Sequence, residues 1–514
     1  MKALGLAVLA TVGFVSVAHA ADILPTTKPA PAPPENCFSS VWSFLDSTAA
    51  DCPLTYGPFT LYATLDAGLM YNTNGAPWNP AFVNGTQGLI SKQSYGSKWL
   101  WSPNNINQSV IGMKVSQPIA YGWSLVATVE AGFDPLSGWP ANSQKSQVIN
   151  NGKAQVLQSA NGDSSRAGQW DNSQGFVGVS NKTYGTLTFG RVNALSLDAL
   201  IAYDAMGGAY AFSPFGFTGA YAGFSDTELA RSNTAFKYRG EFGNFRIAGL
   251  AQVGGYNQGN GSASMWQGDL GGDFKLFGGS PFAGTFSVDA IGSYAKDGVL
   301  TSPINGSCGV VKSGPFKGQT ACTSGIPAFY NADDLKATLS NNTGFMVVGK
   351  YRWNAWTFYG GWEYFRQANP SDNYPNGFQT IGGYNVPGNI LHNKKFPTVW
   401  ITTNAYNVNR VENIFWGGAK YAVNDRLDLI GAIYYVEQNN FLQRPAVCTG
   451  TGIHISSANC SGVYDTFSFL LDYRPVKRVD FYAGVALSNV YGGLANGYLA
   501  AQNIDPTVGL RIKF

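Results

Sequence analysis

Apolar and polar residues alternate one by one along most of this chain, and the last segment shows the pattern most clearly. Between Ile504 and Phe514 the even positions are apolar, or proline where the segment begins, and the odd positions are polar, charged or glycine. A period of two is the signature of a β-strand with one apolar face and one polar face. The polar face carries Arg511 and Lys513 up to the chain end, which suits water better than a packed core.

The same alternation recurs in about sixteen segments, each near the ten-residue length that a tilted membrane strand needs. Charges stand in the middle of the polar faces, and Trp, Tyr or Phe often ends the apolar faces, as in the aromatic girdles of membrane barrels. Each segment alone is also compatible with a half-buried strand of a soluble sandwich. Together they predict an all-β fold, a transmembrane antiparallel β-barrel of about sixteen strands, because only closed barrels satisfy strand edges in lipid.

Short and long connections alternate between these segments. The short ones are 181–185, 240–244, 423–425 and 474–477, and the long ones are 72–106, 134–172, 192–230, 297–341, 368–408 and 439–462. Short turns on one rim and long loops on the other are typical of an outer-membrane barrel with its long loops on the outside.

The N-terminal part divides into two predicted segments before the barrel. Residues 1–20 have the features of a signal peptide, with Lys2, an apolar middle and a small-residue cleavage site at 18–20. An N-terminal membrane helix is the alternative, but the apolar run is short and proline-rich sequence follows it. Residues 21–58 are interpreted as a periplasmic segment with a stiff proline-rich spacer, and residues 59–514 as the barrel.

The composition argues against several classes of function. The net charge of +3 gives no reason to expect a nucleic-acid partner. After the signal peptide only two histidines remain, His392 and His454, and no phosphate-cradling glycine motif or metalloprotease motif is present. The sequence therefore predicts no enzyme, no cofactor and no metal site.

The six cysteines form three pairs that are local in sequence, and an even number in an exported chain indicates disulfides. Local pairing closes short loops and is favoured over the other connectivities, although free thiols or a metal site are alternatives. The residues are Cys37, Cys52, Cys308, Cys322, Cys448 and Cys460.

The sharpest local signal lies between residues 185 and 240. A short strand ends in Phe189-Gly190-Arg191, a loop rich in glycine, alanine and aromatics follows, and a new strand starts at Arg231-Ser232-Asn233. Loops this apolar rarely stay exposed, so we expect the segment 192–230 to fold inward and narrow a lumen that is wide enough to hold water. Packing on neighbouring external loops is the alternative.

These marks, together with the terminal Phe514, resemble the Gram-negative general porin family, and especially the outer-membrane porins of rhizobial-type alphaproteobacteria. With the strand pattern the resemblance covers roughly residues 59–514. It implies a homotrimer of sixteen-stranded barrels in the outer membrane, in contact with lipid and lipopolysaccharide. It also implies a water-filled pore for passive diffusion of small hydrophilic solutes and ions, and a C-terminal Phe514 that is read by the outer-membrane insertion machinery.

The resemblance further implies a constriction between a basic wall and acids on the inward third loop. Strict alternation points Arg191 outward, and a bulge at Gly190 would turn it inward. The basic wall is assigned to Arg191, Arg231, Lys237 and Arg239, and the acidic loop to Asp198, Asp204, Asp226 and Glu228.

Two other functions fit the pattern. A solute-selective channel for a sugar or an anion would use Tyr203, Tyr210, Phe212 and Phe215 as a stacking track. A barrel-anchored adhesin or structural protein would use the long loops and the proline-rich spacer.

Overall fold

The computed structural model describes most of the predicted strands and turns and part of the loops. The described residues are 37–75, 89–90, 96–136, 138, 173–217, 231–253, 264–296, 308–310, 320–322, 341–369, 408–441, 448, 450, 460–495 and 500–514.

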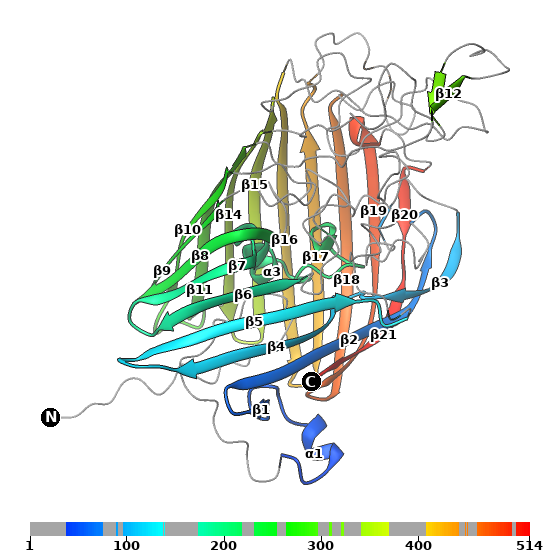
Figure 1. Ribbon diagram of the computed structural model, residues 1–514. Coiled ribbons are helices and arrows are strands. Elements are labelled where there is room, and N and C mark those ends of the chain that lie inside the picture. The colour runs from blue at the N-terminus through cyan, green and yellow to red at the C-terminus, as the bar shows by residue number, and fades with distance from the viewer. Residues whose placement is uncertain are drawn as a thin grey trace.

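Nineteen strands of the described part form one sheet, and this sheet closes into an antiparallel barrel (Figure 1). Three of these strands are short: β1 (Leu54–Tyr56), β3 (Lys98–Pro103) and β20 (Gln502–Ile504). The other sixteen form the wall, as the alternation predicts. They are β2 (Phe59–Asn72), β4 (Ser109–Pro118), β5 (Trp123–Phe133), β6 (Gln174–Asn181), β7 (Gly185–Asn193), β8 (Arg231–Phe242), β9 (Phe245–Val253), β10 (Ser264–Leu276), β11 (Gly284–Lys296), β14 (Asn341–Trp353), β15 (Trp356–Ala368), β16 (Arg410–Asn424), β17 (Leu427–Gln438), β18 (Gly462–Val476), β19 (Val479–Gly492) and β21 (Thr507–Lys513).

Each wall strand pairs with the next along the chain, and the first and last strands close the barrel. Strand β2 pairs with β21 in the register Leu65 to Ile512, and the backbone N–H of Phe514 donates to the carbonyl oxygen of Ala63 at 2.8 Å. The wall is interrupted at two places around this seam: β3 and β4 both pair with β2, and β20 and β21 both pair with β19.

The two faces of the wall differ as the period of two requires. On β5, Leu125 is 45% exposed, whereas its neighbour Val126 is fully buried. Large exposed apolar side chains recur on the outer face of most strands, among them Ile433 and Phe467, and this is the pattern of a surface that contacts lipid. In the described ranges, no helix has the length and apolar character needed to cross a membrane.

A small segment with one disulfide is attached to the short-turn rim of the barrel (Figure 1). Cys37 is bonded to Cys52 around helix α1 (Val41–Leu45), whose first turn is capped by the Ser40 hydroxyl. The buried guanidinium of Arg478, in the turn between β18 and β19, donates to three carbonyl oxygens of this segment, including that of Cys52 at 2.6 Å. The segment is thus fixed to the barrel at a turn more than four hundred residues away in sequence.

The other cysteine pairs lie between wall strands. Cys448 is bonded to Cys460 in the connection between β17 and β18. Cys308 and Cys322 stand opposite each other in the two-stranded sheet of β12 (Cys308–Val310) and β13 (Thr320–Cys322). The pairing that the sequence favoured is therefore present as a bond in two of the three pairs, and the third pair is matched in backbone register.

Candidate pore constriction

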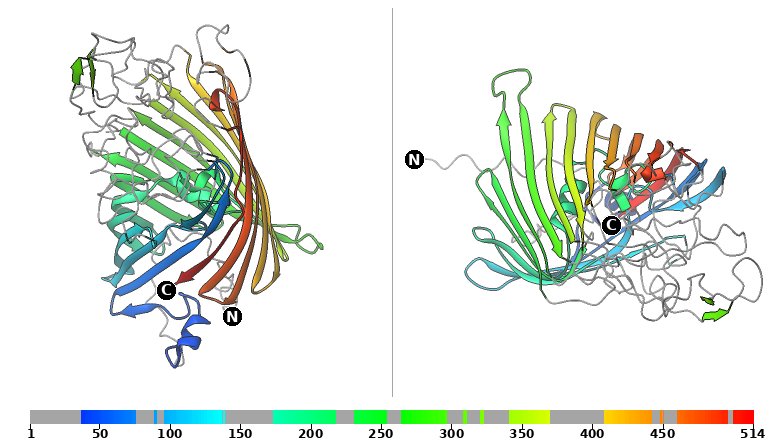
Figure 2. Two further views of the ribbon diagram at one scale, coloured as in Figure 1. Left: turned by 90° about the vertical axis from the view of Figure 1, so that its right-hand side faces the viewer. Right: turned by 90° about the horizontal axis from the view of Figure 1, so that it is seen from above.

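The segment after β7 enters the lumen and contacts the inner face of the wall. It begins with helix α3 (Leu195–Tyr203), continues through a series of turns, and reaches the 3₁₀ helix Pro214–Phe217. Seen along the barrel axis, α3 lies inside the ring of strands (Figure 2). The inward course that the sequence predicts for residues 192–230 is therefore observed for the part up to residue 217, and residues 218–230 lie outside the described residues.

A wall side chain takes the place of the missing cap of α3. The N-cap residue Ala194 has no side chain able to accept a hydrogen bond. Instead the Leu195 N–H donates to Oε1 of Gln267 on β10 at 2.6 Å, and Nε2 of the same amide donates to Ser196 Oγ at 3.1 Å. The wall therefore supplies an acceptor that the first turn of the helix lacks, because free helix N–H groups need one.

Asp198 brings three of the predicted site residues together. Its carboxylate accepts from Lys237 Nζ at 2.7 Å, from the Arg239 guanidinium, and from Asn193 Nδ2 at 3.2 Å. It also lies in the first turn of α3, where the helix dipole favours a negative charge. One predicted acid and two predicted bases thus form a single ion cluster in the lumen.

The second half of the inward segment is attached to strands β16 to β18. Tyr434 donates to Asp204 Oδ1 at 2.6 Å, Trp416 Nε1 donates to the backbone oxygen of Tyr203 at 3.1 Å, and Ser468 Oγ donates to that of Phe212 at 2.6 Å. The segment therefore crosses the lumen from the β8–β10 side to the β16–β18 side. Burial raises the pKa of the Asp204 carboxyl, and the Tyr434 hydroxyl opposes that shift.

The aromatic side chains of the inward segment contribute to this attachment by packing. Tyr203, Tyr210, Phe212 and Phe215 are all at least nine-tenths buried. The Phe215 ring packs edge-on against Trp416 and Tyr434. A track that stacks on sugar rings needs exposed ring faces, so in this conformation the four rings act as packing residues of the loop.

The basic residues at the entrance to the loop are buried in the wall. A register shift lies between Gly190 and Val192, where Gly190 has a φ of 143°, and this irregularity is the bulge that the sequence led us to expect. Arg191 and Arg231 are 3% and 5% exposed and flank the base of the inward segment. The predicted acids Asp226 and Glu228 lie outside the described residues.

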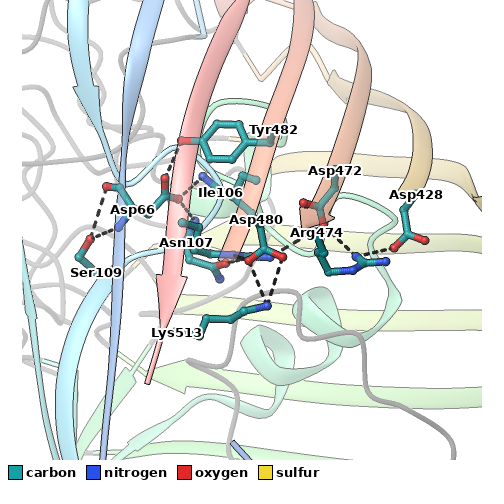
Figure 3. Close-up of polar contacts among 11 residues, drawn as sticks. Asp66, Ile106, Asn107, Ser109, Asp428, Asp472, Arg474, Asp480, Tyr482 and Lys513 are labelled. Atoms are coloured by element: carbon teal, nitrogen blue, oxygen red, sulfur yellow. Dashed lines mark hydrogen bonds and ion pairs between the residues drawn. The ribbon is translucent and has the colours of Figure 1, made fainter. Parts of the chain in front are cut away.

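A second group of inward-facing charged side chains lies on β17, β18, β19 and β21 (Figure 3). Arg474 binds Asp428 at 2.9 Å and Asp472 at 3.1 Å, and Asp480 binds both Arg511 and Lys513. The constriction assigned from sequence does not include these residues, although their even spacing places all of them on the inner face. Their pairing explains how this part of the wall carries many charges, because each of these three buried carboxylates faces a cation.

The carboxylate of Asp66, on β2, binds the backbone of the connection between β3 and β4 (Figure 3). One oxygen of this carboxylate accepts from the backbone N–H groups of Ile106 and Asn107, both at 2.7 Å, and the other accepts from the Tyr482 hydroxyl at 2.6 Å. The carboxylate therefore satisfies the backbone where the chain leaves the β2 ladder, and it has no free face toward the lumen.

Comparison with known proteins places the chain in a family. Residues 5–392 match the sequence profile of a family described as Gram-negative porin. No curated protein matches the chain. Among solved structures, the chain is similar to an anion-selective porin from Comamonas acidovorans, with 11% identity, coverage of 89% of this chain and 99% of that chain, and a TM-score of 0.49.

Two other structures show a similar likeness. OmpT of Vibrio cholerae is 12% identical over 90% of this chain and 100% of that chain, with a TM-score of 0.49. OmpF of Salmonella typhi in complex with daunomycin is 14% identical over 89% of this chain and 97% of that chain, with a TM-score of 0.46. At these identities the assignment rests on the family profile.

Proposed function

Because the chain belongs to the Gram-negative porin family, we propose that the inward segment and the wall around it form the constriction of its pore. The protein is an outer-membrane barrel whose water-filled pore passes small hydrophilic solutes by passive diffusion. The observation that carries the proposal is the attachment of residues 194–217 to two sides of the barrel, by Asp198 to β8 and by Asp204 to β17.

The constriction selects solutes by size and by polarity. A segment attached to two sides of the barrel narrows the lumen without filling it, so the free cross-section beside it sets the size limit. Charged and hydrogen-bonding groups on wall and segment hold oriented water, which an apolar solute would have to displace at a free-energy cost. Small polar solutes replace that water with hydrogen bonds of their own.

In this proposal the constriction includes the residues assigned from the sequence. Arg191, Arg231, Lys237 and Arg239 form its basic side. Asp198 neutralises part of that charge through its pairs with Lys237 and Arg239, and Asp204 fixes the segment to the opposite side. Asp226 and Glu228, which lie outside the described residues, are assigned to the acidic side from the sequence alone.

The assembly and the membrane partners follow from membership of the family. We propose a homotrimer surrounded by outer-membrane lipid and lipopolysaccharide. Phe514 follows β21, and the alternation of that strand, continued by one residue, assigns its side chain to the outward side. In that position it serves both as a lipid-facing side chain and as the residue that the insertion machinery reads.

Conductance in planar bilayers tests the pore. Purified protein should give large ohmic current steps in potassium chloride, grouped in threes if the trimer inserts as a unit. The absence of any conductance from folded, inserted protein would refute the pore. Steps that occur singly would refute only the trimer.

A further inference from the structure

A row of cations alternating with threonines lines the barrel near its short-turn end. Lys275, Thr285, Arg352, Thr357 and Lys420 stand on the adjacent strands β10, β11, β14, β15 and β16, and each is the direct register partner of the next. We call this row the basic rim. It places a cation on every second strand and a hydroxyl on each strand between.

The basic rim faces the lumen. Lys350, two residues before Arg352, donates to a backbone oxygen of the inward segment at 3.0 Å, and Trp416, four residues before Lys420, donates to another at 3.1 Å. Residues separated by an even number of positions on a strand share a face. The basic rim therefore lies on the inner face, between the inward segment and the short turns, where a solute that has passed the constriction meets it.

The basic rim carries positive charge that nearby carboxylates neutralise only in part. Lys275 is exposed and Arg352 half-buried, and within the described ranges neither forms a hydrogen bond or an ion pair. Lys420 lies 3.7 Å from Asp428, but that carboxylate is bound more closely by Arg474, at 2.9 Å.

Two other nearby acids are bound by Arg246. Asp273, two residues before Lys275, also accepts from the Ser287 hydroxyl, and Asp289, four residues after Thr285, lies 3.0 Å from the Arg246 guanidinium. Arg352 is close enough to Lys350 and Lys420 for their like charges to interact. An anion from solution is the remaining source of compensation.

The spacing of the row fits oxyanions. Adjacent strands are about 4.8 Å apart, so successive cations of the row have backbones about 10 Å apart and long side chains that can converge on the threonine between them. An anion above Thr285 is within reach of Lys275 and Arg352, and one above Thr357 is within reach of Arg352 and Lys420. Ammonium and guanidinium groups only donate, and phosphate oxygens accept several such bonds. Metal cations are repelled by the like charges of this row, and neutral solutes gain no charge attraction from it.

We propose that the basic rim binds phosphate groups at the short-turn end of the pore, in two seats that share Arg352. The ligands are inorganic phosphate and small phosphorylated solutes. This inference rests on the proposed pore, and it adds a preference for phosphorylated over neutral solutes. Binding here raises the local concentration of such anions at the mouth of the pore.

The test measures phosphate block of chloride current through the full-length protein in a planar bilayer. Inorganic phosphate added on the short-turn side should reduce the current with a saturable dependence on concentration. Arg352→Gln should raise the half-saturating concentration by about tenfold, since it removes a charge-assisted donor from both seats. Lys275→Gln and Lys420→Gln each affect one seat and should give a smaller rise.

A matched variant separates this site from general charge effects. Lys182→Gln removes a cation from the exposed turn between β6 and β7, on the same rim but outside the row, and should leave the block unchanged. Current steps in potassium chloride alone establish that each variant is folded and open. A normal current that phosphate does not block in a saturable way, or an equal block in the Arg352 and Lys182 variants, overturns the site and leaves the pore intact. The absence of any current refutes the pore itself.

Discussion

Replacing Asp198 by asparagine gives the most direct test of the constriction. The change keeps the shape of the side chain and removes the carboxylate that binds Lys237 at 2.7 Å and the Arg239 guanidinium. The side chains of Asp198 and Lys237 are 8% and 1% exposed, so water screens their pair only weakly. Breaking a buried pair costs about 3–5 kcal/mol. We expect about 2–4 kcal/mol here, because Arg239 is a quarter exposed and solvent can compensate it.

The change weakens the attachment of α3 by this free energy. The second half of the segment keeps its own contacts with the wall. The wall strands, and so the closed barrel, are not affected. Two cations lose the negative charge of Asp198 beside them, so the lumen becomes more positive at this place. The reversal potential in a salt gradient should therefore shift toward anion selectivity, and open-channel noise should rise as the helix detaches for part of the time.

Asp465→Asn is the matched control for this prediction. Asp465 lies on the outer face of β18, where it accepts a hydrogen bond from Asn489, so the same change of charge occurs outside the lumen. We expect the reversal potential of this variant to equal that of the unchanged protein. A shift of equal size in both variants, or none in Asp198→Asn, would refute the placement of Asp198 at the constriction.

Four further changes test other parts of the structure. Arg231→Glu reverses a charge at the base of the inward segment and should shift the reversal potential toward cations; an unchanged value removes Arg231 from the constriction. Leu125→Arg places a charge on the lipid-facing side and should lower the free energy of unfolding, measured by urea titration in lipid vesicles, by about 2–4 kcal/mol if the site is mid-bilayer; unchanged stability contradicts the outward assignment. Tyr434→Phe removes a hydrogen bond to a buried carboxylate, worth about 1.5–3 kcal/mol, and should increase current noise at unchanged selectivity, whereas a current as quiet as before indicates that Asp204 does not hold the segment. Cys52→Ser should make the N-terminal segment more sensitive to protease and leave the conductance unchanged, and a loss of conductance would show that the segment supports the pore.

The secondary structure of the wall was predictable because its signal is local. Alternation along each strand is a property of neighbouring residues, so Leu125 and Val126 can be assigned to opposite faces without knowledge of the fold. The bulge at Gly190 was also foreseeable, since alternation alone would place Arg191 in lipid. The helices α1 and α3 were not foreseen, because they are short and depend on contacts with the barrel, such as that of Gln267 with the first turn of α3.

The sequence alone could not predict which charged residues of the inner face form ion pairs with each other. The interior face of each strand is known from its period, but the partner of a given charge depends on the stagger of strands that lie far apart in the chain. Arg511 binds Asp480 across the last two wall strands, and Arg478 reaches the N-terminal segment across more than four hundred residues. Neither of these two contacts can be predicted from a local sequence pattern.

By itself, the sequence determined an exported all-β chain with a polar inner face, an apolar outer face and an apolar third loop, because a two-residue period and composition need no tertiary contacts to be read. Only the tertiary structure decided where that loop goes and which charges it meets. The ion pair of Asp198 with Lys237 and the hydrogen bond of Tyr434 to Asp204 join segments whose separation is set by closure of the barrel. Barrel closure is a property of all sixteen wall strands together.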